Sequence, residues 1–170
     1  MLSQISENLN KNDLFSHTQS AYRPKHSTET VLRKIINDLL LALDRGEVSI
    51  LTLLDLSAAF DTIDHSILIC RLELNFAFDG AVLSWFWSYL TGRQQIVVVR
   101  GFRSAPSLVE YGVPPGSVLG PILVVLYLPP LDETFSHHSV GHYAFADDTQ
   151  PYGHVHLTLF KVLFEKWRNV

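Results

Sequence analysis

The sequence predicts an α+β fold, with helices packed on one face of a largely antiparallel sheet. Two patterns carry this prediction. Helical and strand-like segments follow one another in irregular order, and the last strand-like segment contains its own turn, as a hairpin does. The chain has 170 residues, of which 47% are hydrophobic and 18% charged. This composition is sufficient for a buried core and argues against general disorder.

The first strongly predicted helix begins near Thr28, where Ser27 or Thr28 can cap it, and ends before Gly46. The run 48–56 (VSILTLLDL) is rich in β-branched and aliphatic residues and is predicted to form a central strand, with Asp55 near its carboxyl end. The apolar residues of the helix recur at helical spacing, and they are Val31, Leu32, Ile35, Ile36, Leu39, Leu40 and Leu43.

The later elements are predicted from the same signals of periodicity and of Gly and Pro breakers. In chain order they are helices at about 65–75 and 81–90, strands at about 95–100 and 107–111, a Gly/Pro loop at 112–116, a helix at about 117–128, a hairpin at 140–153 and a partial helix in the tail 154–170.

Charge and cysteine content limit the function classes. The net charge of −4 has the wrong sign for a protein that binds nucleic acid with its whole surface, so such a role requires local basic patches. The single cysteine, Cys70, excludes an internal disulfide and favours an intracellular location, in the cytoplasm or the nucleus. The uncharged stretch 112–131 is interrupted by prolines and glycines, so we expect no membrane span.

Three carboxylates follow apolar strand-like runs. Asp55 follows ILTLL, and Asp147 and Asp148 follow YAFA. A lone Asp-Asp pair is most often a solvated turn, and adjacent like charges are unfavourable without a neutralising cation. If the two strands are neighbours, the three carboxylates would form an oxygen-rich site suited to Mg²⁺.

Four sequence blocks place these aspartates in a wider pattern. In chain order they are QSAYRPKHSTETVL (19–32), LLDLSAAFDTIDH (53–65), YGVPPGSVLGPILVVLY (111–127) and YAFADDTQPY (143–152). Taken together, and with the weaker block 84–99, they resemble the reverse transcriptase of non-LTR (LINE-type) retrotransposons. The resemblance implies a polymerase palm-like sheet and RNA-directed DNA polymerase activity, with an RNA template, a DNA primer and deoxynucleotides as partners.

The resemblance also implies roles for individual residues. Asp55, Asp147 and Asp148 match the carboxylates that bind two Mg²⁺ ions for nucleotidyl transfer, with the backbone carbonyl of Leu56 as an additional ligand. Of the pair, Asp147 matches the direct ligand. Phe60 matches the aromatic residue that selects deoxynucleotides; the alternative is an ordinary core phenylalanine.

Three further residues match nucleotide-binding positions. Arg23 matches a basic residue near the template or the triphosphate, and the alternative is a solvated loop charge. Gly116 and Ser117 match the Gly-Ser of the third block. The family has Gln immediately before that pair, and this chain has Pro115, which offers neither a side-chain amide nor a backbone donor. The resemblance therefore implies that this chain lacks an amide which lies near the nucleotide and the template in the family.

The resemblance divides the chain into a polar segment 1–18, a reverse transcriptase domain 19–153 with the palm and part of the fingers, and a divergent tail 154–170. A thumb is expected to be missing, so the chain is interpreted as a truncated, palm-centred fragment. The alternative function is a catalytically inactive relic, or a module that binds nucleic acid or protein.

Other polar residues receive structural interpretations. His65 is expected to order its turn, and Asp64 to support the following helix N-terminus. His137, His138 and His142 are interpreted as loop histidines, because no cysteine or acidic residue at metal-ligand spacing completes a site around them.

Overall fold

A computed structural model describes residues 2–114 and 116–161, so Pro115 and the last part of the tail, 162–170, lie outside the described residues. The chain forms two compact units, each built from two separate segments. Unit 1 comprises Met1–Phe15 and Leu56–Pro129, and unit 2 comprises Ser16–Asp55 and Pro130–Val170. The mixed helices and small antiparallel sheets confirm the α+β class.

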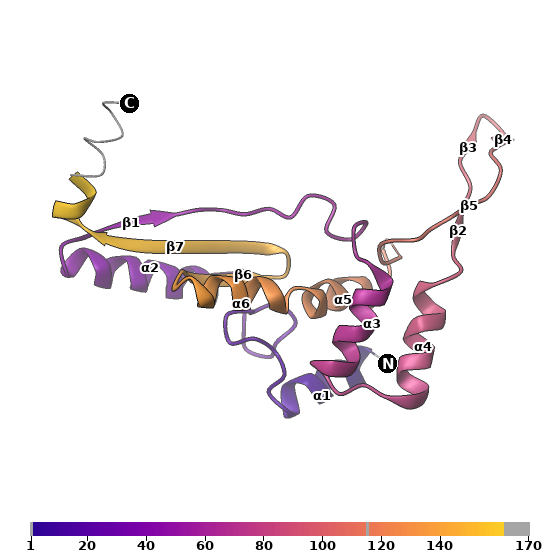
Figure 1. Ribbon diagram of the computed structural model, residues 1–170, viewed down its shortest axis with the longest axis horizontal. Helices are drawn as coiled ribbons and strands as arrows, with labels where there is room; N and C mark the ends of the chain where they lie inside the picture. Colours follow the sequence, from indigo (N-terminus) through magenta and orange to yellow (C-terminus); the bar gives the residue numbers. More distant parts are fainter. Residues whose placement is uncertain (1, 115, 162–170) are drawn as a thin grey trace. The chain divides into compact units, whose positions relative to one another are not determined.

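Unit 1 is mainly helical. It contains α1 (Leu2–Lys11), α3 (His65–Leu74), α4 (Gly80–Leu90) and α5 (Gly120–Tyr127), and α3 contacts both α4 and α5 (Figure 1). Every residue from Ile122 to Leu126 in α5 is buried, so this short helix forms the centre of the unit's core. The apolar run that superficially suggested a membrane segment is therefore a core helix, and no helix among the described residues is long and apolar enough to span a membrane.

Two short ribbons extend from α4 in unit 1. Strand β2 (Gln94–Gln95) pairs with β5 (Ser107–Leu108), and β3 (Val98–Val99) pairs with β4 (Phe102–Arg103), in each case antiparallel. The predicted strand 95–100 is divided into β2 and β3, the predicted strand 107–111 is shortened to β5, and β4 was not predicted. The chain turns from β3 into β4 through the left-handed pair Arg100 and Gly101. The ribbons bury little surface, and Phe102 is 81% exposed.

Unit 2 is a three-stranded antiparallel sheet with helical cover. The strand order is β1 (Glu47–Leu51), β7 (Asp148–His156) and β6 (Gly141–Phe145), and α2 (Thr28–Asp44) runs beside β1 and β6 (Figure 1). The hairpin predicted for 140–153 is confirmed as β6 and β7, with β7 at the centre of the sheet. The helix predicted from Thr28 is confirmed, and Ser27 caps it in a reciprocal capping box with Thr30.

Helices contact both faces of this sheet and not, as the sequence pattern predicted, only one. On β6, Tyr143 lies under the ammonium group of Lys34 of α2, whereas the adjacent His142 bonds to Asp132 of α6 (Pro129–His137). Successive side chains of a strand point to opposite faces, so α2 and α6 approach β6 from different sides. His142 is therefore a buried strand residue, and its interpretation as a loop histidine is wrong.

The central strand contains a proline, and the ladder breaks beside it. Thr52 donates its backbone N–H to the carbonyl of Pro151 at 2.9 Å, but Pro151 has no N–H to return to Thr52. Regular pairing between β1 and β7 stops at Leu51, and one isolated bridge follows at Leu54. The missing donor accounts for a strand that ends sooner than the predicted 48–56.

Two helices were not predicted from the sequence. In α1, the polar segment buries only Ile5 and Leu9, one turn apart, which is a weak periodic signal. In α6, Pro129 and Pro130 directly follow the predicted helix 117–128 and stand in the first turn of a new helix, where a proline lacks only an N–H that has no helical partner.

Gly112 is held tightly against the turn that follows the second block. Its φ is +80°, and a Cβ added there would lie 2.7 Å from the carbonyl oxygen of Phe60 and 2.8 Å from the Cα of Asp61. The neighbouring Val113 N–H donates to the same Phe60 carbonyl at 2.8 Å. The second and third blocks therefore meet backbone to backbone inside unit 1.

We expect Gly112→Ala to lower the free energy of unfolding by at least about 2 kcal/mol, because it adds a backbone clash to the cost of a left-handed alanine. Gly92→Ala is the matched control: Gly92 has φ +70° in the same unit with no atom within 4 Å of the added Cβ, so only the cost of about 1 kcal/mol for the conformation remains. Urea unfolding of the two variants measures the difference, and equal losses would contradict the close contact.

Asp132 gives the fold a pH dependence. Burial by itself raises the pKa of its carboxyl, but hydrogen bonds from Thr18, His142 and Ser16 outweigh burial and hold the pKa below its usual value of 3.8. A carboxyl group whose pKa is lower in the folded than in the unfolded state stabilises the fold at pH values above its unfolded-state pKa. This stabilisation is lost as the pH falls through the folded-state pKa.

We therefore expect the unfolding free energy to decline as the pH falls below about 4, and Asp132→Asn to flatten that decline. The matched control is Glu133→Gln, which removes an exposed carboxylate from the same helix. Denaturant melts at several pH values between about 2 and 6 test this, and a decline of undiminished slope in Asp132→Asn would show that the network does not stabilise the fold.

Candidate active site

Unit 2 brings the second and fourth sequence blocks together through backbone pairing. Leu54 and Thr149 exchange two hydrogen bonds, with N···O distances of 2.9 Å and 3.1 Å, in an isolated antiparallel bridge. The next residues in register are Asp55 and Asp148. Directly opposed residues of an antiparallel pair project to the same face, so these two aspartates occupy facing positions, and both are exposed.

Asp147 lies in the two-residue loop between β6 and β7 and is half-buried. Tyr22 lies close enough for their charges to interact: burial, together with the negative charge of Asp147, raises the pKa of the Tyr22 phenol. The tyrosine of the first block therefore lies within electrostatic range of the aspartate of the fourth block.

The first block also supports the hairpin directly. Ser20 donates its backbone N–H to the Ala144 carbonyl, and the Ala144 N–H donates to Thr18, each at 2.9 Å. The segment 18–20 therefore pairs in parallel along the outer edge of β6. Gln19, in the middle of this segment, is buried, and its side-chain amide bonds to Ala146 in the hairpin turn.

The guanidinium of Arg23 bonds to the backbone of its own loop. Its Nη1 donates to the Ser16 carbonyl at 2.9 Å and to the Gln19 carbonyl at 3.3 Å. The side chain is half-buried, so the alternative of a simple solvated loop charge does not describe it. These contacts give Arg23 a part in holding the loop that presents Gln19.

The three aspartates do not form a three-carboxylate cluster. Among residues 2–114 and 116–161, no group of three or more His, Cys, Asp or Glu side chains lies close enough to hold a metal ion. Continuing the register from the Leu54–Thr149 bridge places Asp55 opposite Asp148, whereas Asp147 lies one residue further on, in the β6–β7 turn, where alternation no longer directs it to the same face.

The other four candidate residues lie in unit 1. The carbonyl of Leu56 accepts a hydrogen bond from Ala59 at 3.1 Å within the turn that contains half-buried Phe60. Gly116 is exposed, with φ +69°. Ser117 Oγ accepts the N–H of Gly120 at 3.0 Å, which satisfies a free donor at the start of α5.

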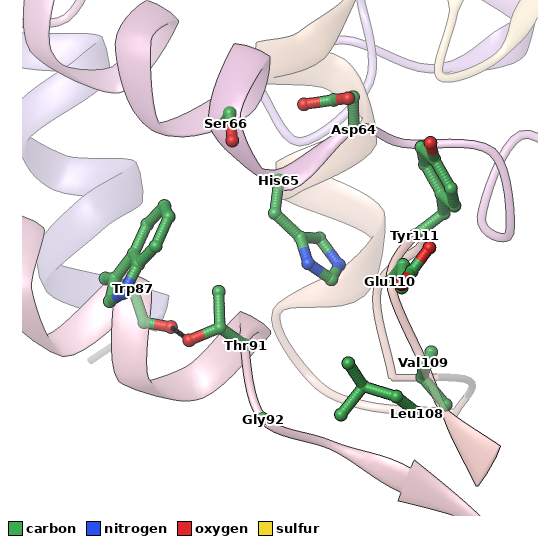
Figure 2. Close-up of a pocket in the computed structure, with 10 residues that line it drawn as sticks. All are labelled: Asp64, His65, Ser66, Trp87, Thr91, Gly92, Leu108, Val109, Glu110 and Tyr111. Carbon is green, nitrogen blue, oxygen red and sulfur yellow. Dashed lines mark hydrogen bonds between the residues drawn. The ribbon is translucent and has the colours of Figure 1, made fainter.

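A pocket of about 250 Å³ lies in unit 1 between α3, the end of α4 and the segment 109–111 that follows β5 (Figure 2). The ring of His65 points into it, and its Nε2 lies 2.8 Å from the carbonyl oxygen of Gly112. Asp64 Oδ1 accepts the Ile67 N–H at 2.9 Å and caps α3. The role predicted for Asp64 is confirmed, whereas His65 contacts the third block at Gly112 and not the turn that it was expected to order.

Sequence comparisons identify relatives over much of the chain. The profile of the family described as reverse transcriptase (RNA-dependent DNA polymerase) matches residues 1–157. Over 109 residues, or 64% of the chain, the sequence is 33% identical to the probable RNA-directed DNA polymerase from transposon BS of Drosophila melanogaster. It is 32% identical over the same length to the RNA-directed DNA polymerase from mobile element jockey of Drosophila funebris. The matched region spans 12% of the length of each relative.

Solved structures share the fold at low sequence identity. Apo telomerase of Candida tropicalis, truncated from its C-terminal domain, matches with a TM-score of 0.65 at 18% identity, covering 95% of this chain and 34% of that chain. The apo telomerase of the same organism matches with a TM-score of 0.66 at 16% identity, covering 96% and 32%. With residues 1–157 matched to the family profile and with retrotransposon enzymes among its relatives, the chain belongs to the reverse transcriptase (RNA-dependent DNA polymerase) family.

Proposed function

We propose that the chain is part of the RNA-directed DNA polymerase of a non-LTR retrotransposon, and that the sheet of unit 2 is its palm-like catalytic sheet. One observation carries the proposal: the exchange of backbone hydrogen bonds between Leu54 and Thr149 sets Asp55 opposite Asp148. Two sequence-distant acidic motifs therefore converge at one end of a sheet.

The donor chemistry suits a hard divalent cation. Like charges that face each other across two strands are destabilising unless they are neutralised, and carboxylate oxygens are the ligands that Mg²⁺ prefers. Asp55 and Asp148 face each other by register, and we propose that Asp147, one residue away in the β6–β7 turn, directs its carboxylate toward them to complete the metal site. Mg²⁺ ions bound there would supply activation of a primer 3′-hydroxyl and neutralisation of the leaving pyrophosphate.

The remaining candidate residues are assigned to substrate binding. We propose that Phe60 selects deoxynucleotides and that Gly116, Ser117 and the Leu56 carbonyl contribute to nucleotide binding. The loop of Arg23 would lie near the template or the triphosphate. An RNA template and a DNA primer are the expected partners.

The cation site is tested with Mn²⁺ as a spectroscopic substitute for Mg²⁺. We expect Asp55→Asn and Asp147→Asn each to weaken Mn²⁺ binding by about tenfold or more, because each removes a charged oxygen ligand. Asp148→Asn, measured in parallel, shows which member of the pair ligates the ion. Titration calorimetry or Mn²⁺ electron spin resonance provides the affinities.

Asp44→Asn is the control, because Asp44 is an exposed carboxylate at the end of α2 in the same unit. Its affinity should equal that of the unmodified chain. If Asp55→Asn bound Mn²⁺ as tightly as this control, the aspartates would not form a cation site.

A second candidate function is an inactive relic that persists as a binding module. Pro115 favours it, since the family has Gln at this position, and proline supplies no amide to nucleotide or template. Positioning contributes several kcal/mol to such reactions, and each 1.36 kcal/mol changes the rate tenfold.

We therefore expect little extension of a DNA primer on an RNA template by the unmodified chain, and a clear increase after Pro115→Gln. The assay is primer extension with deoxynucleotides and Mg²⁺, with Asp147→Asn as the inactive reference. Robust extension by the unmodified chain that disappears in Asp147→Asn would refute the relic and establish the polymerase.

A further inference from the structure

The loop that carries Asp147 has an unfavourable backbone conformation. Phe145 pairs with Asp148, so only Ala146 and Asp147 connect β6 to β7. Ala146 has φ +59°, a region that disfavours residues with a Cβ and that two-residue hairpin loops usually assign to Gly, Asn or Asp. A loop of this kind requires contacts from outside the hairpin to keep one conformation.

Gln19 supplies those contacts. Its Nε2 donates to the Ala146 carbonyl at 3.0 Å, and its Oε1 accepts the Ala146 N–H at 2.9 Å. The same Oε1 accepts the Ala21 N–H at 3.0 Å. One buried amide thus satisfies both backbone groups of Ala146, and Gln19 itself is only 6% exposed.

These three bonds fix the orientation of the amide. If its oxygen and nitrogen exchanged places, the NH₂ group would face two backbone N–H donors and the oxygen would face a carbonyl. The amide therefore functions in one orientation, and only a side chain with both a donor and an acceptor at this length can make the full set of contacts.

The backbone of Gln19 is itself held in place. It lies in the segment 18–20 that pairs with β6 at Ala144, and its carbonyl accepts a hydrogen bond from Arg23. The backbone pairing fixes the Cα of Gln19 beside the hairpin turn, and the three amide hydrogen bonds hold its side chain against Ala146. Three residues after Gln19 comes Tyr22, and burial together with the negative charge of Asp147 raises the pKa of its phenol.

We infer that Gln19 is a positioning residue for the cation site, whose buried amide fixes the Ala146 backbone and thereby the direction of the Asp147 carboxylate. The inference rests on the proposed function, because it concerns the same aspartates. It adds a role for the first sequence block, which connects that block to the acidic hairpin through the protein interior.

The test compares Mn²⁺ affinity in the full chain with and without the amide. Gln19→Leu keeps a similar volume and removes all three side-chain hydrogen bonds, and we expect it to weaken Mn²⁺ binding by about tenfold. In the double variant Gln19→Leu/Ala146→Gly, glycine tolerates the positive φ without support, so affinity should recover in part. Gln95→Leu, at an exposed glutamine of β2, is the control and should leave the affinity unchanged.

Amide hydrogen exchange in the unmodified chain provides a readout that needs no variant to fold. The Ala146 N–H should exchange slowly because it donates to Gln19 Oε1, and Gln19→Leu should accelerate it. Rapid exchange of Ala146 in the unmodified chain would overturn the contact.

The outcomes separate this inference from the proposed function. If the unmodified chain binds Mn²⁺ and Gln19→Leu binds it equally well, the positioning role is wrong while the cation site stands. If the unmodified chain binds no Mn²⁺, both the cation site and the positioning role are overturned, even where a protected Ala146 confirms the contact itself.

Discussion

The pairing of Leu54 with Thr149 is the contact on which the candidate site depends. Pro151 leaves only one of the two ladder hydrogen bonds at Thr52, and the regular pairing between β1 and β7 stops at Leu51. The two hydrogen bonds between Leu54 and Thr149 pair the chain with β7 once more beyond Leu51. The next residue of each strand in the same register is Asp55 on one side and Asp148 on the other. A single isolated bridge therefore decides where the first acidic motif lies.

The hairpin that receives this bridge is supported from its other edge. The segment 18–20 pairs along β6, and Thr18 donates from it to Asp132 of α6 at 2.6 Å. Asp132 in turn bonds to His142 of β6. The outer strand is thus held by both backbone and side-chain contacts, so the β6–β7 turn has a defined position on the side away from β1. The first sequence block thus supports the hairpin that contains the fourth block.

Local signals predicted local features. The spacing of apolar residues and the Ser27 cap predicted α2, and the alternation around 140–153 predicted the hairpin. The family resemblance, carried by four blocks in order, predicted membership that the comparisons confirm. The break at Pro151 also follows from sequence, because proline lacks a donor wherever it stands in a ladder.

Features that depend on long-range contacts were not predictable. The burial of His142 depends on which elements meet, and a sequence gives no direct signal of that. The start of α6 at Pro129 did have a local signal, because proline suits the first turn of a helix as well as the end of one. The contact of Gln19 could not be predicted either. The sequence shows an amide side chain at the start of the first block, but its hydrogen-bond partner Ala146 lies in the fourth block. The register that selects Asp148, and not Asp147, as the residue facing Asp55 likewise follows only from the pairing.

The most direct test of this account is an NMR measurement of the contact between the α protons of Asp55 and Asp148. Residues that flank a hydrogen-bonded antiparallel pair approach most closely, with Cα atoms about 4.5 Å apart, so their α protons nearly touch. The register set by the Leu54–Thr149 bridge predicts a strong nuclear Overhauser effect between these two protons in the labelled chain. If the Asp55 α proton instead contacts a different residue of β7, or none in that strand, the register is wrong and the two acidic motifs do not form one site.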